Sequence, residues 1–157
     1  LRPWRPSVPI LVHDVDNDSD SDIIWGVGHS YGLYWLEQQK TAGGSVTWKK
    51  HLIDATWSQP HFLILADLDR DGNQELITGK RYRAHALADP GSEHPLCVYY
   101  YRWDRQARQW DRRPVHEGGQ VGFGIYTAAG DIDGDGDIDI VAPGKSGLYL
   151  LENLLIR

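Results

Sequence analysis

The chain has 157 residues, which is the size of one ordinary domain or of a short run of small repeats. Hydrophobic residues make up 41% of it, enough for a packed core. No stretch approaches the roughly 20 apolar residues of a membrane-spanning helix, so we expect no membrane partner. The net charge of −6 argues against a nucleic-acid partner, because a general nucleic-acid binder presents a basic face. A single cysteine, Cys97, excludes an internal disulfide framework.

The sequence contains no methionine and shows no signal-peptide pattern at its start. An intact primary translation product begins with methionine, and we therefore expect the chain to be a processed or excised piece.

In chain order, the sequence predicts three copies of one unit and no amphipathic helix. Each unit has an apolar strand, an acidic loop, a second strand, a glycine-containing connection and a third strand, and the first two units add a fourth. Four antiparallel strands that recur about every 50 to 65 residues are typical of β-propeller blades. The expected strands are 9–12, 23–25, 32–37, 47–53, 62–66, 76–78, 96–101, 109–115, 125–129, 138–141 and 147–152.

The fold class is therefore all-β, with residues 1–157 as a single β-propeller segment of about three blades. We expect blades at 9–54 and 60–117 and an incomplete blade at 123–157, with a strand at 1–8 that completes another blade. Three blades are fewer than a closed propeller has, so the partners we expect are further copies of the chain or the remaining blades of a longer parent. In the strands, Trp25, Trp35, Trp48 and Trp110 are expected in the core between blades.

The three loops read DVDNDSDSD from residue 14, DLDRDGNQE from residue 67 and DIDGDGDID from residue 131. Acidic residues recur at loop positions 1, 3, 5 and 9, and glycine stands at position 6 in the second and third loops. Alternate carboxylates on a tight loop can face one centre, and calcium prefers six to eight oxygen ligands. A solvated acidic turn would explain one such cluster better than three with the same spacing.

We therefore expect up to three calcium ions, with position 7 giving its backbone carbonyl and the first loop weakest because Ser19 replaces glycine. The expected ligands are Asp14, Asp16, Asp18, Asp20, Asp22, Asp67, Asp69, Asp71, Asn73, Glu75, Asp131, Asp133, Asp135, Asp137 and Asp139. An EF-hand is excluded, because its position 12 needs a bidentate glutamate and this chain has Trp25, Thr78 and Ala142 there.

The stretches DIDGDGDIDIVAPGKSGLYLLEN and DLDRDGNQELITGK resemble the FG-GAP/VCBS family of β-propeller repeats. The resemblance implies a propeller of seven or eight blades with calcium between the first two strands of a blade. Members include integrin α-chains, fungal lectins, polysaccharide lyases and sugar dehydratases, so the fold does not fix the function. GKRYRAH at 79–85 and GGQVGFG at 118–124 are most similar to propellers related to aldos-2-ulose dehydratase.

Connections alternate between the two ends of a blade, so the sequence predicts a basic, histidine-containing face opposite the acidic loops. The candidate ligand-binding residues on this face are His29, Lys80, Lys145, Trp57 and Gln59, although Trp57 could instead cap the core. The candidate catalytic residues are His61, His85, Tyr82, Arg81 and Arg83. Each of these, taken alone, is explained better as a solvated turn residue, and the functional interpretation depends on their gathering on one face.

Three functions stay open at this point. The first is a calcium-stabilised module that binds carbohydrate. The second is a carbon–oxygen lyase, either a sugar dehydratase or a polysaccharide lyase, in which His61 or His85 removes a proton beside a carbonyl or carboxylate. The third is a structural or adhesive scaffold. Calcium loops of this kind often need the free calcium found outside the cytosol, so we expect an extracellular or periplasmic location.

Overall fold

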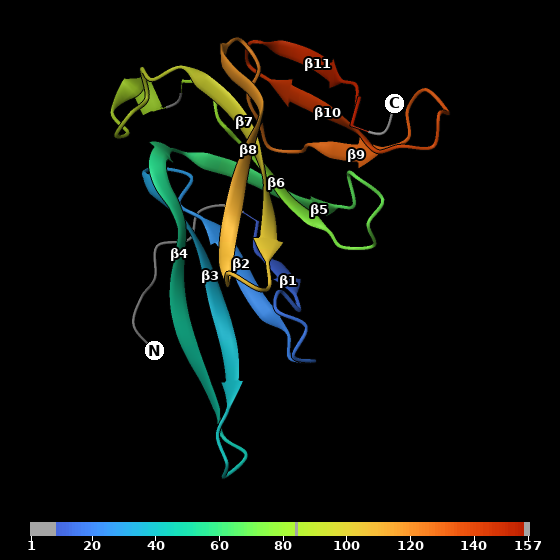
Figure 1. Ribbon diagram of the computed structural model, residues 1–157. Coiled ribbons are helices and arrows are strands. Elements are labelled where there is room, and N and C mark those ends of the chain that lie inside the picture. Colours follow the sequence, from blue (N-terminus) through green and yellow to red (C-terminus); the bar gives the residue numbers. More distant parts are fainter. Residues whose placement is uncertain (1–8, 84, 156–157) are drawn as a thin grey trace.

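The computed structural model describes residues 9–83 and 85–155, and it confirms the predicted all-β class. Within these ranges the chain forms eleven β-strands and one short 3₁₀ turn, η1 (His85–Leu87), with no α-helix (Figure 1). No helix in this part of the chain is long and apolar enough to cross a membrane. The strand expected at 1–8 lies outside the described residues.

The strands form three antiparallel sheets whose order follows the chain. The first blade contains β1 (Leu11–His13), β2 (Asp22–Gly26), β3 (Tyr31–Lys40) and β4 (Val46–Ser58). The second contains β5 (Pro60–Ala66), β6 (Glu75–Lys80), β7 (Leu96–Asp104) and β8 (Gln109–Gly119). The third contains β9 (Ala128–Gly130), β10 (Asp139–Gly144) and β11 (Gly147–Leu151). Two four-stranded blades are thus followed by a sheet of three strands.

Some strand ends differ from those predicted. β4 and β8 continue to Ser58 and Gly119, and two register shifts in each pairing let these long strands bend. The predicted strand 125–129 is shorter, because β9 begins only at Ala128. The pairing of β9 with its partner β10 ends at Ala128 and Val141, and Pro143 follows two residues later in β10. Because proline has no backbone N–H, it cannot donate a hydrogen bond that would extend the pairing toward residue 125.

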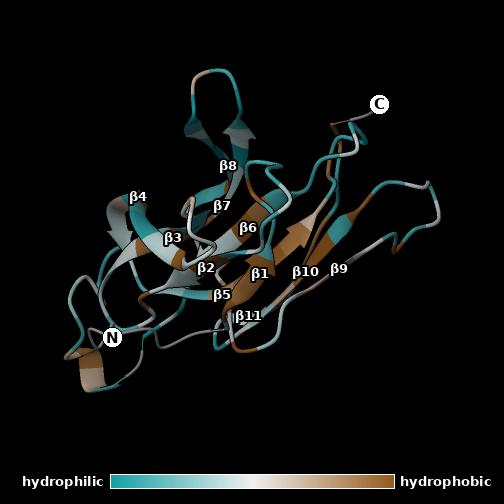
Figure 2. Cartoon of the chain, turned by 90° about the horizontal axis from the view of Figure 1, so that it is seen from below, coloured by the Kyte–Doolittle hydropathy of each residue, from teal (hydrophilic) through white to brown (hydrophobic). Residues whose placement is uncertain are grey.

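The hydrophobic core lies between blades. One cluster joins the first and second blades and includes Trp35, Leu63, Leu76 and Tyr101. Figure 2 shows that the hydrophobic residues lie mainly along the strands, whereas the end of the β7–β8 hairpin is hydrophilic.

A second hydrophobic cluster joins the second and third blades and includes Ile77, Phe123 and Ile140. Neighbouring residues of β6, Leu76 and Ile77, face opposite clusters because side chains alternate along a strand. The second blade is therefore packed on both of its faces.

The tryptophans follow the predicted pattern only in part. Trp35 is buried in the first cluster and Trp110 packs against it, while Trp25 is buried and stacks on Tyr34. Trp48 is 42% exposed, so its expected place in the core is wrong. It lies near the hairpin end of β4, whereas the cluster between the first two blades takes only Ile53 and Trp57 from that strand.

Replacing Leu76 by alanine tests the packing between the first two blades. Leu76 is fully buried, so the cavity left by Leu76→Ala should lower the free energy of unfolding by about 2 to 5 kcal/mol. Leu52→Ala is the matched control, because Leu52 is 57% exposed and its loss should change stability by no more than about 0.5 kcal/mol. Urea unfolding measures both, and equal effects would contradict this packing.

Candidate functional site

The two ends of the blades carry different loops. The three acidic loops each join the first two strands of a blade, at 14–21, 67–74 and 131–138. At the opposite end, segments that connect strands and blades bind one another through the backbone. Gln59 N donates to Ser30 O at 2.7 Å, and Phe123 N donates to Lys80 O at 3.1 Å. The basic connections expected from the sequence are thus joined into one surface across neighbouring blades.

The acidic loops share one backbone conformation. Position 4 has positive φ in all three, at Asn17, Arg70 and Gly134. Position 6 also has positive φ, at Gly72 and Gly136 and at Ser19 in the first loop. A left-handed conformation is costly for a residue with a side chain, so Ser19 carries strain that glycine avoids in the other loops. This confirms the sharp turn that the glycines predict.

The carboxylates of each loop hold its backbone. In the second loop the carboxylate of Asp67 accepts hydrogen bonds from the N–H groups of Asp71 and Gly72, at 3.1 and 2.9 Å. Asp14 receives the same two bonds in the first loop, from Asp18 and Ser19. These bonds fold the loop back on its first residue, which brings alternate side chains toward one centre.

The structure brings three carboxylates together in each loop, with one oxygen from each within 4.8 Å of the others. In the first two loops these come from positions 1, 3 and 5, and in the third from positions 1, 3 and 9. The groups are Asp14, Asp16 and Asp18, then Asp67, Asp69 and Asp71, then Asp131, Asp133 and Asp139.

The acids at position 9, which the sequence predicts as metal ligands, also have a structural role that was not predicted. Asp22, Glu75 and Asp139 are almost fully buried, and each accepts a hydrogen bond from the N–H at position 2 of its own loop. Burial raises the pKa of Asp22 and of Glu75. This structural role could have been predicted from the sequence, because an acidic residue stands at position 9 in all three loops.

Arginines from the β7–β8 hairpin balance part of the acidic charge. Arg102 lies 3.1 Å from Asp69 and 3.3 Å from Asp71, and Arg108 lies 3.2 Å from Asp16. These arginines are about half exposed, so each pair contributes little to stability. The all-oxygen donor set suits a hard divalent cation.

On the opposite face, a cavity of about 590 Å³ lies between the second and third blades. Four of the residues that the sequence predicts at a ligand-binding or catalytic site line this cavity: His61, Arg81, Tyr82 and Lys145. Tyr126 adds an aromatic ring that is 79% exposed. The cavity therefore combines cationic groups with aromatic surface.

His61 is held in one tautomer. Its Nδ1 lies 2.9 Å from the carbonyl oxygen of Gly124, and a carbonyl can only accept, so Nδ1 carries the proton. Nε2 is left as the basic nitrogen. Burial lowers the pKa of His61, and the positive charge of Arg81 acts in the same direction. His61 is therefore neutral at pH 7.

His29 and His85 lie together at another part of this face, beside Asp89. Asp89 was not among the predicted site residues, and its sequence neighbourhood, a turn with Pro90 and Gly91, gives no signal for it. Arg83 stacks on Tyr82, with its guanidinium carbon 5.6 Å from the ring centre. The carbonyl of Arg83 accepts a hydrogen bond from Lys145 at 3.0 Å.

Lys80, Gln59 and Trp57 are buried away from that cavity. Lys80 Nζ donates to Ser58 Oγ at 2.8 Å and to Gln59 Oε1 at 3.0 Å. Trp57 packs in the first core cluster and donates from Nε1 to the hydroxyl of Tyr101. Lys80 and Trp57 line a second cavity of about 300 Å³ with Cys97, whose pKa burial raises to about 11. Of the two uses considered for Trp57, the structure places it in the core.

Residues 14–78 match the FG-GAP-like repeat family. The matched segment runs from the first acidic loop through β2, β3, β4 and β5 to the second loop and into β6. FG-GAP repeats are β-propeller blades, and the antiparallel sheets of this chain have that form. A search of the curated proteins finds no match.

The buried Lys80 predicts a pH dependence of stability. Burial lowers its pKa from 10.5 to about 8, so between these values the unfolded chain binds more protons than the folded one. Stability should therefore rise as the pH increases from 8 to 10.5, by up to about 3 kcal/mol from this group. Lys80→Met should lack this gain. Urea unfolding at stepped pH measures the difference, and parallel curves for the two proteins would refute the prediction.

Proposed function

We propose that the chain is a calcium-binding propeller module of the VCBS type whose basic face binds an anionic carbohydrate. The observation that carries the proposal is the cavity between the second and third blades, where cationic and aromatic side chains meet on the face opposite the acidic loops. Binding sites commonly lie on loops that a rigid scaffold holds in place.

Calcium fits the acidic loops by its chemistry. Each loop offers three carboxylates within reach of one ion, and the backbone carbonyls of the same turn add oxygen donors. Bound calcium would reduce the repulsion between these carboxylates, so the ion would stabilise the folded loops.

Calcium removal tests this part of the proposal. Chelation with EDTA should lower the melting temperature, and Asp133→Ala should weaken one site, because Asp133 belongs to the carboxylate group of the third loop. Glu93→Ala is the control, since Glu93 is exposed and far along the chain from the acidic loops. Calorimetry with calcium and thermal unfolding measure both effects. An unchanged melting curve after chelation would contradict calcium binding.

The cavity suits a sugar acid for two reasons. Arg81 lines the cavity, and its contacts with Asp89 and His29 use only some of the five N–H donors of the guanidinium, so others are left for a ligand carboxylate. Tyr82 and Tyr126 present exposed aromatic surface on which a sugar ring can stack. Lys145 adds a further positive charge at the rim.

Binding to acidic and neutral oligosaccharides tests the proposal. Oligosaccharides that contain uronic acids should bind more tightly than neutral ones, because the cavity carries positive charge. Tyr126→Ala and Lys145→Ala should each weaken binding by about tenfold, whereas Lys49→Ala, an exposed change on β4, should not. Calorimetry measures the affinities. Equal binding of the acidic and neutral sugars would contradict an anionic site.

His61 favours a sugar lyase or dehydratase as the second candidate, the reaction class suggested by the resemblance to aldos-2-ulose dehydratase. A neutral imidazole with free Nε2 can remove a proton beside a carboxylate or carbonyl. The electron pair forms a carbon–carbon double bond as the neighbouring carbon–oxygen bond breaks, and Tyr82 protonates the leaving oxygen. Arg81 stabilises the enolate-like intermediate. An unsaturated product that absorbs in the ultraviolet would appear only in this case.

The proposal also includes the cellular location of the chain and its assembly with further blades. An extracellular or periplasmic location supplies the calcium that such loops need. Exposed apolar side chains on the outer blades, among them Val12 and Leu148, are consistent with further blades from copies of the chain or from a longer parent. If calcium changes stability while sugars neither bind nor react, the scaffold function is the better account.

A further inference from the structure

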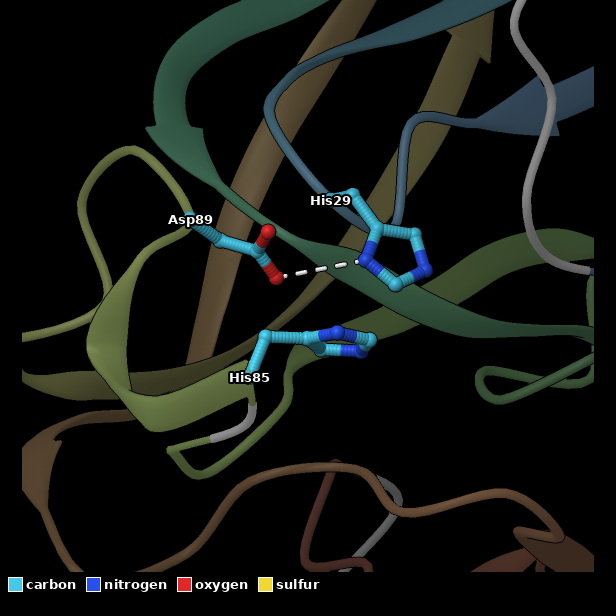
Figure 3. A group of neighbouring side chains, drawn as sticks. All are labelled: His29, His85 and Asp89. Atoms are coloured by element: carbon cyan, nitrogen blue, oxygen red, sulfur yellow. Dashed lines mark hydrogen bonds and ion pairs between the residues drawn. The ribbon is translucent and has the colours of Figure 1, made fainter.

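Two histidines and one aspartate form a cluster at the junction of the first two blades. His29 comes from the connection between β2 and β3, and His85 and Asp89 come from the long connection between β6 and β7. His29 Nδ1 lies 3.2 Å from Asp89 Oδ2, and one donor atom from each of the three residues lies within 4.8 Å of the others. Figure 3 shows His85 beside the facing pair of His29 and Asp89.

We propose that His29, His85 and Asp89 bind a divalent transition metal of the zinc class. Zinc binds histidine nitrogen and carboxylate oxygen at about 2.0 to 2.2 Å, so neighbouring donors on a tetrahedron lie about 3.4 Å apart. The pair of His29 and Asp89 already has nearly this separation. The donor atom of the third ligand, His85, lies within 4.8 Å of the other two and must move closer to them when the metal binds. Three protein ligands leave one tetrahedral position for water or a ligand.

The donor set distinguishes this cluster from the acidic loops. Among the described residues, four groups could hold a metal, and only this one contains nitrogen donors. Imidazole suits zinc, copper and nickel, whereas carboxylate and carbonyl oxygens suit calcium and magnesium. The cluster also lies on connections at the end of the blades opposite the acidic loops. The two kinds of site should therefore be loaded independently.

Arg81 is the group that such an ion must displace. Its guanidinium is in contact with Asp89 Oδ2 and lies 3.1 Å from His29 Nδ1. His29 Nδ1 lies within hydrogen-bond distance of the guanidinium, which can only donate, and of Asp89 Oδ2, which accepts, so either tautomer has a partner. A metal would bind the nitrogen in its unprotonated form. Arg81 also lines the neighbouring cavity, which gives its side chain space to move. Arg81 therefore competes with the metal for the same two atoms.

The metal ligands are separate from the residues of the proposed sugar site. The ligands His29, His85 and Asp89 do not line the cavity between the second and third blades. Arg81 alone is shared, because it contacts Asp89 and lines that cavity. A chain that binds no sugar can still bind the metal, and failure of one proposal leaves the other standing.

Titration with zinc, in calcium sufficient to saturate the acidic loops, tests the site. The full chain should bind zinc at a site that His29→Ala and His85→Ala each weaken at least tenfold, and Asp89→Asn should do the same. His94→Ala is the matched control, because exposed His94 contacts Tyr31 and lies outside the cluster. Circular dichroism shows whether each variant is folded. Zinc affinity that survives both histidine changes would overturn the proposal.

Two further measurements separate this site from adventitious zinc binding. Arg81→Gln should tighten zinc severalfold, because it removes the competing positive charge, and weaker binding would contradict the competition. Cobalt(II) should give an intense visible absorption typical of tetrahedral coordination, and His29→Ala should abolish it. A weak spectrum like that of hydrated cobalt, unchanged in His29→Ala, would overturn the tetrahedral site.

Discussion

The hydrogen bond between the carboxylate at loop position 9 and the N–H at position 2 is the contact on which each blade depends. It measures 3.1 Å from Val15 to Asp22, 2.8 Å from Leu68 to Glu75 and 3.0 Å from Ile132 to Asp139. A buried carboxylate is stable only when its oxygens are paired, so the first two strands of the blade must meet in one register. The two ends of the acidic loop are therefore held at a fixed distance from each other.

The same position-9 carboxylates also fix the position of the third strand in two blades. The other oxygen of Asp22 accepts from the N–H of Gln38, and the other oxygen of Asp139 accepts from the N–H of Asn153. One side chain therefore joins the loop to the third strand in the first blade, and to the chain just after the third strand in the third blade. The acidic end of the protein is held by buried carboxylates, while the opposite end is held by backbone bonds between connections.

The blades and acidic loops could be predicted from the sequence because both repeat. Positive φ at position 6 follows from glycine in two loops, and Ser19 shows the same conformation imposed where the residue does not favour it. The exposure of Trp48 could not be predicted, because it depends on how far a neighbouring blade extends. Asp89 was missed for a related reason, since it meets His29 only through a contact across 60 residues. The role of a single residue on a long connection depends on tertiary contacts, and such contacts produce no repeating pattern in the sequence.

The lone thiol has a consequence for how the second blade can be studied. Cys97 is 5% exposed, and burial keeps it protonated well above neutral pH. A protonated thiol is a poor nucleophile, so the native fold protects it from alkylating reagents. The rate at which this sulfur is covalently labelled would then report how often β7 separates from its neighbours. Cys97 is therefore a natural probe of local unfolding in the second blade.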